Sequence, residues 1–253
     1  MKTAGGSGGF TLVEIAIVLV VVGLLLGGIL KGQEMINNAK VRSIADRQVS
    51  LKVAWHKFVD RFGGLPGDYE LADSYIAGTE PGDGDGAIDE NEAPLAFQHL
   101  TAAGYLRCAQ CTQTRTSSGI TPTAANSLVN NYGGVMSIWD DATHYAFPTA
   151  AHSHGVANTP RLMSHTGPRI PSNILAEVDR KIDDGVPNTG DMRFNRYDPT
   201  GAEEPAVAEC TKTDAAGGTA GSLPKTSSAG ANFWRPAQVT PPVYGNCGAS
   251  IFI

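Results

Sequence analysis

The sequence is poor in charge, in aromatic residues and in cysteine, and each shortage excludes a class of protein. Charged residues make up only 17% of the 253 residues and hydrophobic residues 42%, so extensive disorder is not expected. The 19 Lys and Arg against 25 Asp and Glu argue against a protein that coats nucleic acid through a basic surface, and no nucleic-acid partner is expected. Four cysteines are too few for a disulfide-built fold but suffice for two local disulfides.

Catalytic motifs are also missing from the sequence. It contains no Gly-x-Ser-x-Gly segment, no Walker loop and no His-Glu-x-x-His segment. The Ser, His and acidic residues that are present cannot be grouped into a triad from their spacing. We therefore do not expect the chain to be an enzyme.

One long hydrophobic run stands near the start of the chain. Residues 10–30 contain a single charged residue, Glu14. As a helix this run would be roughly 30 Å long, which matches the hydrocarbon core of a bilayer. A secretory signal peptide has a shorter apolar core and ends in small residues of the A-x-A type, whereas this run ends at Leu30 and Lys31. We expect one membrane span, and a plain single-span anchor is the alternative.

Glu14 favours a more specific interpretation of this run. A carboxylate within an apolar span costs about 3 kcal/mol, so we expect Glu14 to have a partner. The segment GGFTLVE, residues 8–14, leads directly into the span. It resembles the processing site of type IV prepilins and of type II secretion pseudopilins.

This resemblance implies a path from the membrane to a filament. Prepilin peptidase would remove the leader, residues 1–9, by cutting after Gly9, and would methylate Phe10. The cut leaves the span attached, so the protein would begin as a single-pass precursor in the inner membrane. The resemblance also implies that Glu14 is the assembly acid, paired with the α-amino group of Phe10 on a neighbouring subunit. Pairing offsets the cost of burying either charge alone.

The function implied by the resemblance is structural. Copies of the chain and other pilin-like subunits would polymerise through their N-terminal helices into an extracellular filament or a periplasmic pseudopilus, for attachment, motility or protein secretion. The alternative is a monomeric, membrane-anchored, exported calcium-binding protein that does not polymerise. Glu14 distinguishes the two, because a mere anchor would tolerate Val there.

The helix is expected to continue beyond the membrane. Residues 31–62 contain no Pro and a single Gly, and their apolar residues recur every three or four positions. This spacing predicts one helix face that packs on a globular head, a short coiled coil being the alternative. The face consists of Val41, Ile44, Gln48, Leu51, Trp55, Phe58 and Phe62. The segment GGLP, residues 63–66, predicts the end of the helix.

The rest of the chain, residues 63–253, is predicted to form the exported head. We expect an α+β fold with an antiparallel sheet, short helices and long loops. Helices are predicted over residues 94–103 and 172–182, the second capped by Ser172. Strands are predicted over residues 135–139 and 144–147.

The head begins with an acidic segment. Residues 62–106 contain nine acids and no Lys or Arg, and residues 80–92, EPGDGDGAIDENE, resemble the twelve-position calcium loop. The loop ligands would be Asp83, Asp85, the carbonyl of Ala87, Asp89 and Glu92. The first position is Pro81, which has no side-chain oxygen, so Glu80 or an acid from elsewhere would have to substitute. Dense oxygen ligands favour Ca²⁺, and a solvated acidic turn is the alternative.

Two further segments extend the resemblance into the head. LPGDY at residues 65–69 and AFQHLTAAG at residues 96–104 flank the acidic segment. The combination resembles a subset of prepilin-like proteins with an acidic insert of this kind.

The four cysteines allow two disulfides. Cys210 and Cys247 would close a long loop, which is worth about 3–4 kcal/mol. Cys108 and Cys111 could form a tight local bridge, with redox chemistry as the rival interpretation. Two other pairings remain open on the sequence alone.

Two other polar groups are weaker candidates for a metal site. His152 and His154 would share one face of a strand, with His144 and His165 nearby in sequence, but a polar loop is the alternative. Asp183 and Asp184 follow the second predicted helix, and we interpret them as turn residues that form Asx-type hydrogen bonds.

Overall fold

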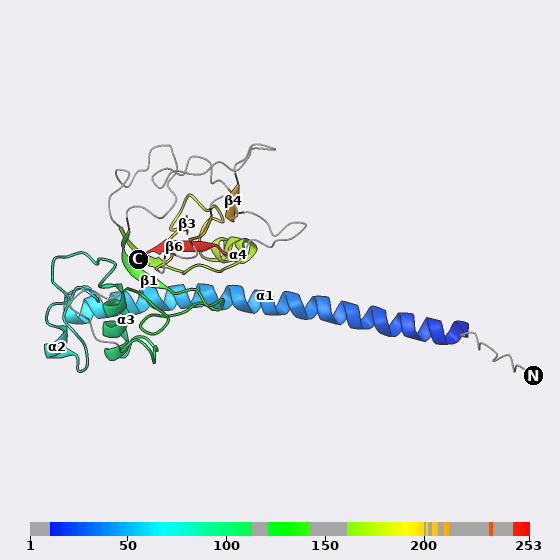
Figure 1. The fold of residues 1–253 in the computed structure, drawn as a ribbon, viewed down its shortest axis with the longest axis horizontal. Coiled ribbons are helices and arrows are strands. Elements are labelled where there is room, and N and C mark those ends of the chain that lie inside the picture. Colours follow the sequence, from blue (N-terminus) through cyan, green and yellow to red (C-terminus); the bar gives the residue numbers. More distant parts are fainter. Residues whose placement is uncertain are drawn as a thin grey trace, which may run out of the picture. The chain divides into compact units, whose positions relative to one another are not determined.

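The computed structural model describes residues 11–112, 121–141, 161–199, 201, 204–206, 210–212, 233–234 and 245–253 (Figure 1). The fold is α+β, with a long apolar N-terminal helix, a four-stranded antiparallel sheet and short helices, as predicted. The chain divides into two compact units, one of residues up to Lys40 and one of Val41–Ile253.

Helix α1, Leu12–Phe62, is continuous over 51 residues, which confirms the predicted extension of the hydrophobic run. It ends where the glycine pair predicts. The N–H of Gly63 donates to the carbonyl of Val59 over 2.9 Å, and Gly63 has a φ of 72°. Glycine adopts this left-handed conformation without the strain of a Cβ, so it terminates the helix.

The part of α1 that belongs to the second unit buries one face. The buried residues recur at three- and four-residue spacing: Val41, Ile44, Ala45, Gln48, Leu51, Ala54, Trp55 and Phe58. Phe62, the last residue of the predicted face, is half-buried. The opposite face is exposed and polar at Arg42, Asp46 and Lys57. The structure therefore confirms the predicted face, and the head packs on it.

The main sheet has the strand order β1-β2-β6-β3, and every neighbouring pair is antiparallel. Its strands are β1 (Ser137–Asp141), β2 (Arg161–His165), β6 (Gly248–Phe252) and β3 (Met192–Asn195). Strands β4 (Thr211–Lys212) and β5 (Phe233–Trp234) form a separate two-stranded ladder. The strand predicted over 135–139 is shifted by two residues to Ser137–Asp141. Val135 instead forms an isolated bridge with Val129. The strand predicted over 144–147 lies outside the described residues.

Among the described residues, three short helices complete the second unit. They are α2 (Ala72–Tyr75), α3 (Ala93–Ala102) and α4 (Ser172–Ile182). Helix α3 begins and ends one residue before its prediction, and α4 has the predicted bounds. The predicted cap of α4 is wrong: Pro171 occupies the capping position with extended geometry, Ser172 is the first helical residue, and no side chain caps the end. The carbonyl of Pro171 accepts instead from the N–H groups of Ile174 and Leu175.

Two hydrophobic clusters fill the second unit, and α1 contributes to both. The Val41 cluster comprises Val41, Ile44, Ala45, Ile170, Ile174, Leu175, Ala176, Val178, Met192, Phe194, Cys210, Trp234, Cys247 and Ala249. The Leu51 cluster comprises Leu51, Ala54, Trp55, Phe58, Ile76, Ile88, Ala96, Phe97, Leu100, Cys108, Cys111, Leu128, Met136 and Ile138. Gln48 lies between the two along the buried face of α1.

Candidate membrane helix and metal centre

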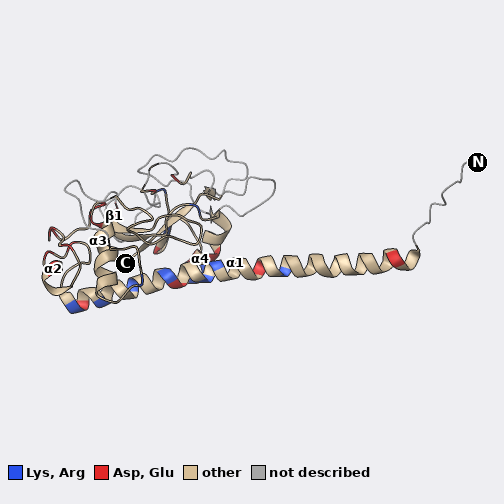
Figure 2. Cartoon of the chain, turned by 60° about the horizontal axis from the view of Figure 1, so that its bottom comes forward, with Lys and Arg blue, Asp and Glu red and all other residues tan. Residues whose placement is uncertain are grey.

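The N-terminal part of α1 is apolar and unburied. Every residue from Thr11 to Lys31 is exposed, and Leu12 and Leu24 are 90% and 73% exposed. Between Glu14 and Lys31 there is no charged residue, so a long part of the helix in Figure 2 is neither blue nor red. Among the described residues, α1 is the one helix long and apolar enough to cross a membrane. Apolar surface of this extent in water indicates contact with lipid or with protein.

Glu14 closes a capping box at the start of α1. The backbone N–H and the hydroxyl of Thr11 donate to Glu14 Oε2 over 2.8 and 2.9 Å, and the Glu14 N–H donates to Thr11 Oγ1 over 3.2 Å. A Thr followed three residues later by Glu is the signature of this motif. Glu14 thus has a role within its own chain that the sequence analysis did not assign. Gly9 and Phe10, the predicted cleavage and methylation residues, lie outside the described residues.

The acidic loop brings together three carboxylates from two segments. One carboxylate oxygen each from Asp68, Asp83 and Asp85 lie within 4.8 Å of one another. Asp83 and Asp85 are exposed, whereas Asp68 is only 5% exposed. Burial raises the pKa of Asp68, and the charge of Asp85 acts in the same direction although backbone N–H groups oppose it. These acids form a group that could bind a metal ion.

The backbone of the loop is fitted closely against Asp68. The Gly84 N–H donates to the Asp68 carbonyl over 3.1 Å, and the Gly86 N–H donates to Asp68 Oδ2 over 3.0 Å. Both glycines have a positive φ, 74° and 89°. A Cβ on Gly82 would come within 2.3 Å of the Asp68 backbone carbon. Glycine is therefore required for the loop to lie this close to Asp68.

Asp89 and Glu92 make hydrogen bonds within the loop, and neither belongs to the group of three. Asp89 Oδ1 accepts from the Glu92 N–H over 2.9 Å, and Glu92 Oε1 accepts from the Asp83 N–H over 3.1 Å. Glu92 is only 1% exposed. Burial raises its pKa to about 7, and the charges of Asp83, Asp89 and Asp68 add to this effect. Ala87 donates its N–H to Asp85 Oδ1 over 2.9 Å.

Ile88 attaches the loop to the rest of the head through its buried side chain and two backbone hydrogen bonds. Ile88 is fully buried in the Leu51 cluster, its N–H donates to Asp140 Oδ2 over 2.8 Å, and its carbonyl accepts from the Asp140 N–H over 2.8 Å. Asp140 belongs to β1, so the loop is fixed to the edge of the sheet. Burial raises the pKa of Asp140, with a further contribution from the charge of Asp85.

His99 on α3 holds both ends of the segment that precedes the loop. Its Nδ1 accepts from the Gly67 N–H over 3.0 Å, and its Nε2 lies 2.6 Å from the Glu80 carbonyl. This pairing requires a neutral ring with the proton on Nε2. Burial lowers the pKa of His99, which agrees with a neutral ring.

A second acidic group lies at the end of α4. Oxygens of Asp179, Asp183 and Asp184 also lie within 4.8 Å of one another. Each of these acids accepts a hydrogen bond from a donor in the head. The donors are Trp234 Nε1 and Gly185 N for Asp179, Met192 N for Asp183, and Val186 N and Thr189 Oγ1 for Asp184. The bond from Val186 to Asp184 is of the Asx type.

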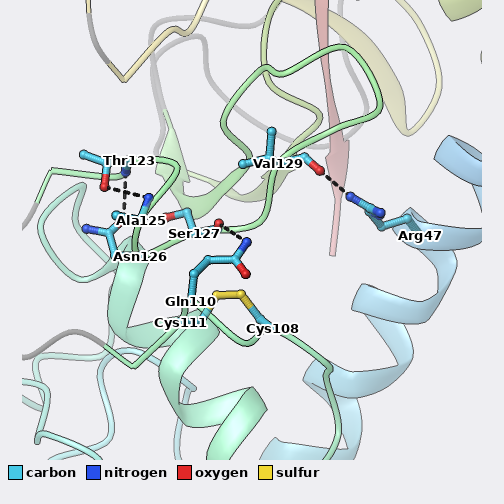
Figure 3. Close-up of a disulfide and its surroundings, with 9 residues drawn as sticks. All are labelled: Arg47, Cys108, Gln110, Cys111, Thr123, Ala125, Asn126, Ser127 and Val129. Atoms are coloured by element: carbon cyan, nitrogen blue, oxygen red, sulfur yellow. Dashed lines mark hydrogen bonds between the residues drawn. A yellow bond between two sulfur atoms is a disulfide. The ribbon is translucent and has the colours of Figure 1, made fainter.

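Both disulfides that the sequence analysis favoured are formed in the structure, Cys108–Cys111 and Cys210–Cys247. Beside the first, Gln110 donates to the carbonyl of Ser127 and Arg47 of α1 donates to the carbonyl of Val129 (Figure 3). The second lies in the Val41 cluster.

The histidines predicted as a possible metal site are not described as a group. His144, His152 and His154 lie outside the described residues. His165 is buried in β2, and its Nδ1 lies 2.7 Å from the hydroxyl of Ser250.

The sequence analysis missed Asp68 as a member of the acidic group. Asp68 precedes Asp83 by fifteen positions, outside the spacing of the calcium-loop motif. Two features of the sequence could have identified it. Pro81 lacks the side-chain oxygen that the first loop position needs, and Asp68 is an acid within residues 62–106, which contain no Lys or Arg.

Comparison of the chain with protein-family models, with curated proteins and with solved structures gave no match. The pilin resemblance therefore rests on the sequence alone, chiefly on residues 8–35, and less on 65–106.

Proposed function

We propose that the chain is a pilin-like structural subunit that is anchored in the inner membrane by α1 and then polymerises with copies of itself and with other pilin-like subunits. The observation that carries this proposal is the unburied apolar surface of α1 from Leu12 to Leu30. Lipid can cover this surface in the precursor, and neighbouring helices can cover it in a filament. The role is structural rather than catalytic.

Glu14 explains why this helix would leave the lipid. Within one chain its carboxylate bonds only to donors of Thr11 among the described contacts. Prepilin peptidase would expose the α-amino group of Phe10 by cutting after Gly9. In a staggered filament this amine would lie beside Glu14 of a neighbouring subunit, and each would neutralise the other in an apolar environment. A plain anchor needs no acid at this depth.

We propose Ca²⁺ as the ion of the acidic loop. The candidate ligands are carboxylate oxygens without Lys, Arg, His or Cys among them, and such hard oxygen donors suit Ca²⁺. The crowded acids also repel one another: burial is the main cause of the raised pKa of Glu92, and the charges of Asp83, Asp89 and Asp68 raise it further. A divalent cation would relieve this repulsion and stabilise the exported head.

The capping box allows a test that separates charge from helix structure. Glu14→Gln keeps a side chain that can close the box, because Gln serves at this position too, but it removes the charge. Thr11→Val breaks the box and keeps the acid. We expect Glu14→Gln to reduce filament yield at least about tenfold, since the amine of Phe10 loses its counter-charge. Thr11→Val is expected to retain filaments.

The measurement is electron microscopy of material sheared from cells, with mass spectrometry of the N-terminus. Methylated Phe10 is expected as the first residue of both variants and of the wild type. A native protein that begins at Met1, or filaments from Glu14→Gln in normal amount, would contradict the proposal. Those outcomes would favour the alternative, a membrane-anchored calcium-binding protein that does not polymerise.

A further inference from the structure

We propose that Asp68, Asp83 and Asp85 bind the cation together, so that the ion joins the acidic loop to the segment that follows α1. The inference rests on the proposed calcium function. It adds a ligand from outside the twelve-position loop motif and assigns Asp89 and Glu92 to positioning the loop.

The spacing of the three acids suits one calcium ion. Their oxygens lie within 4.8 Å of one another. Ca²⁺ binds oxygen at about 2.3–2.6 Å, so two oxygens on opposite sides of one ion are roughly 4.6–5.2 Å apart. The three carboxylates can therefore reach a common ion without rearrangement of the loop. Asp83 and Asp85 are exposed, which gives the ion access from solvent.

Asp68 gives a second observation, independent of the spacing, that indicates a bound cation. The residue is only 5% exposed, and its Oδ1 has no hydrogen-bond partner among the described residues. Its Oδ2 is already bonded to the Gly86 N–H. A buried carboxylate oxygen without a partner costs free energy, and native proteins almost always satisfy such atoms. A cation between Asp68 and the two exposed acids would satisfy it.

The surrounding backbone holds these acids in place before any ion binds. The N–H groups of Gly84 and Gly86 are bonded to Asp68, and Gly82 donates to the Tyr69 carbonyl over 3.1 Å. One oxygen of Asp83 accepts from the Asp85 N–H over 3.2 Å, which fixes the direction of that carboxylate. Little ordering of the chain would be needed on binding, and this favours affinity.

Asp89 and Glu92 act on the site through the backbone. Glu92 Oε1 holds the Asp83 N–H, and Asp89 Oδ1 holds the Glu92 N–H at the start of α3. Both are positioning residues in this arrangement. Asp68 therefore takes the place left open by Pro81.

An ion at this site would stabilise the Leu51 cluster. The residue after Asp68 is Tyr69, whose ring lies 6.1 Å from that of Phe58 and 6.0 Å from that of Phe62. On the loop side, Ile88 is buried in the same cluster. Binding at the three aspartates would therefore connect two segments that both pack on the end of α1.

The first test is calcium binding by the full-length chain in neutral detergent, measured by calorimetry and by thermal unfolding with and without CaCl₂. We expect the wild type to bind and its Tm to rise. Asp68→Asn keeps the size of the side chain and is expected to weaken binding at least about tenfold and to lose the Tm rise. Asp184→Asn, in the other acidic group, is the matched control and is expected to retain the Tm rise.

The outcomes separate the two proposals. A wild type that binds no calcium overturns the calcium function itself. A wild type that binds, with Asp68→Asn unchanged or Asp184→Asn impaired as strongly, overturns the ligand assignment and leaves calcium in place. Hydrogen exchange of the wild type gives a readout that does not depend on variant folding. Calcium should slow exchange in residues 67–70 as well as 82–88, and protection of the loop alone would contradict the assignment.

Discussion

The Val41 cluster and the Leu51 cluster each contain one disulfide and lie beside one group of three aspartates, but the polar groups beside them are satisfied in different ways. Beside the Val41 cluster, each aspartate accepts hydrogen bonds from donors of the head, and Trp234 Nε1 reaches Asp179 over 2.6 Å. Beside the Leu51 cluster, Asp68 Oδ1 has no partner among the described residues. The same number of acids thus forms a closed turn in one place and an open site in the other.

The two disulfides also differ, in the length of chain that each one closes. Cys210–Cys247 spans 37 positions and Cys108–Cys111 only three. A long loop loses more conformational freedom when it is closed, so the first bond restricts the unfolded chain far more. The Val41 cluster is thus stabilised by contacts within the chain, whereas the proposed cation would supply part of the stability of the Leu51 cluster.

The largest expected effect comes from the long-range disulfide. Replacing Cys210 and Cys247 together by Ala should lower the free energy of unfolding by about 4 kcal/mol, and the same change at Cys108 and Cys111 by about 2 kcal/mol or less, because the closed loops differ in length. Denaturant unfolding of the full-length variants in detergent measures both values. Equal losses would contradict the expected difference in stability between the two clusters.

A smaller effect is expected from the pH dependence of the Val41 cluster. Burial raises the pKa of Asp179 to about 7, with the charges of Asp184 and Asp183 acting in the same direction, whereas an unfolded Asp titrates near about 3.9. The folded state keeps this proton where the unfolded state has lost it. The free energy of unfolding therefore falls as the pH rises from about 4 to about 7, at most by about 1.4 kcal/mol per pH unit.

Asp179→Asn removes this titration. Its Tm should vary less than that of the wild type between about pH 5 and about pH 8, so the Tm of the variant relative to the wild type should rise by a few degrees towards the alkaline end. Thermal unfolding in EGTA buffer measures the difference without calcium at the other site. Glu177→Gln, an exposed change on the same helix, is the control and should leave the slope unaltered. Parallel pH curves for Asp179→Asn and wild type would show that the buried acid is not what titrates.

The sequence predicted the regular elements of the fold from local rules. The face of α1 follows from its three- and four-residue spacing, and its end follows from Gly63. Helix α4 was predicted in full from the same periodicity. Its cap was not predicted correctly, because Pro171 with its extended geometry occupies the capping position and Ser172 is the first helical residue. Which residue occupies that position depends on the conformation of the chain that precedes the helix.

The acidic site could be predicted only in part, for a different reason. Asp83 and Asp85 belong to a local motif, but Asp68 reaches them because α1 ends at Phe62 and the following segment folds back beneath Gly82 and Gly84. The capping box of Glu14 was within reach of the sequence, since Thr11 stands three residues before it. The apolar surroundings of the acid predict a partner in another subunit, but they do not exclude a local partner such as Thr11.

The smallest expected effect concerns the boundary between the two clusters. Gln48 is buried there, its Oε1 accepts from the Ser164 hydroxyl over 2.6 Å, and its Nε2 has no partner among the described residues. Ser164→Ala should cost about 1–2 kcal/mol, because it leaves the amide oxygen unsatisfied as well.

The double variant Gln48→Met with Ser164→Ala tests whether the hydrogen bond between Ser164 and Gln48 at this boundary stabilises the head. It removes both polar partners and fills the space with an apolar side chain of similar length, so its free energy of unfolding should lie within about 1 kcal/mol of the wild type. The coupling between the two sites then cancels most of the summed losses of the two single variants. Denaturant unfolding of the wild type, the two single variants and the double variant gives this coupling. A double variant that loses the sum of the single effects would mean that the Gln48 amide makes a stabilising interaction of its own, and the two clusters would then have to be treated as one core with a polar centre.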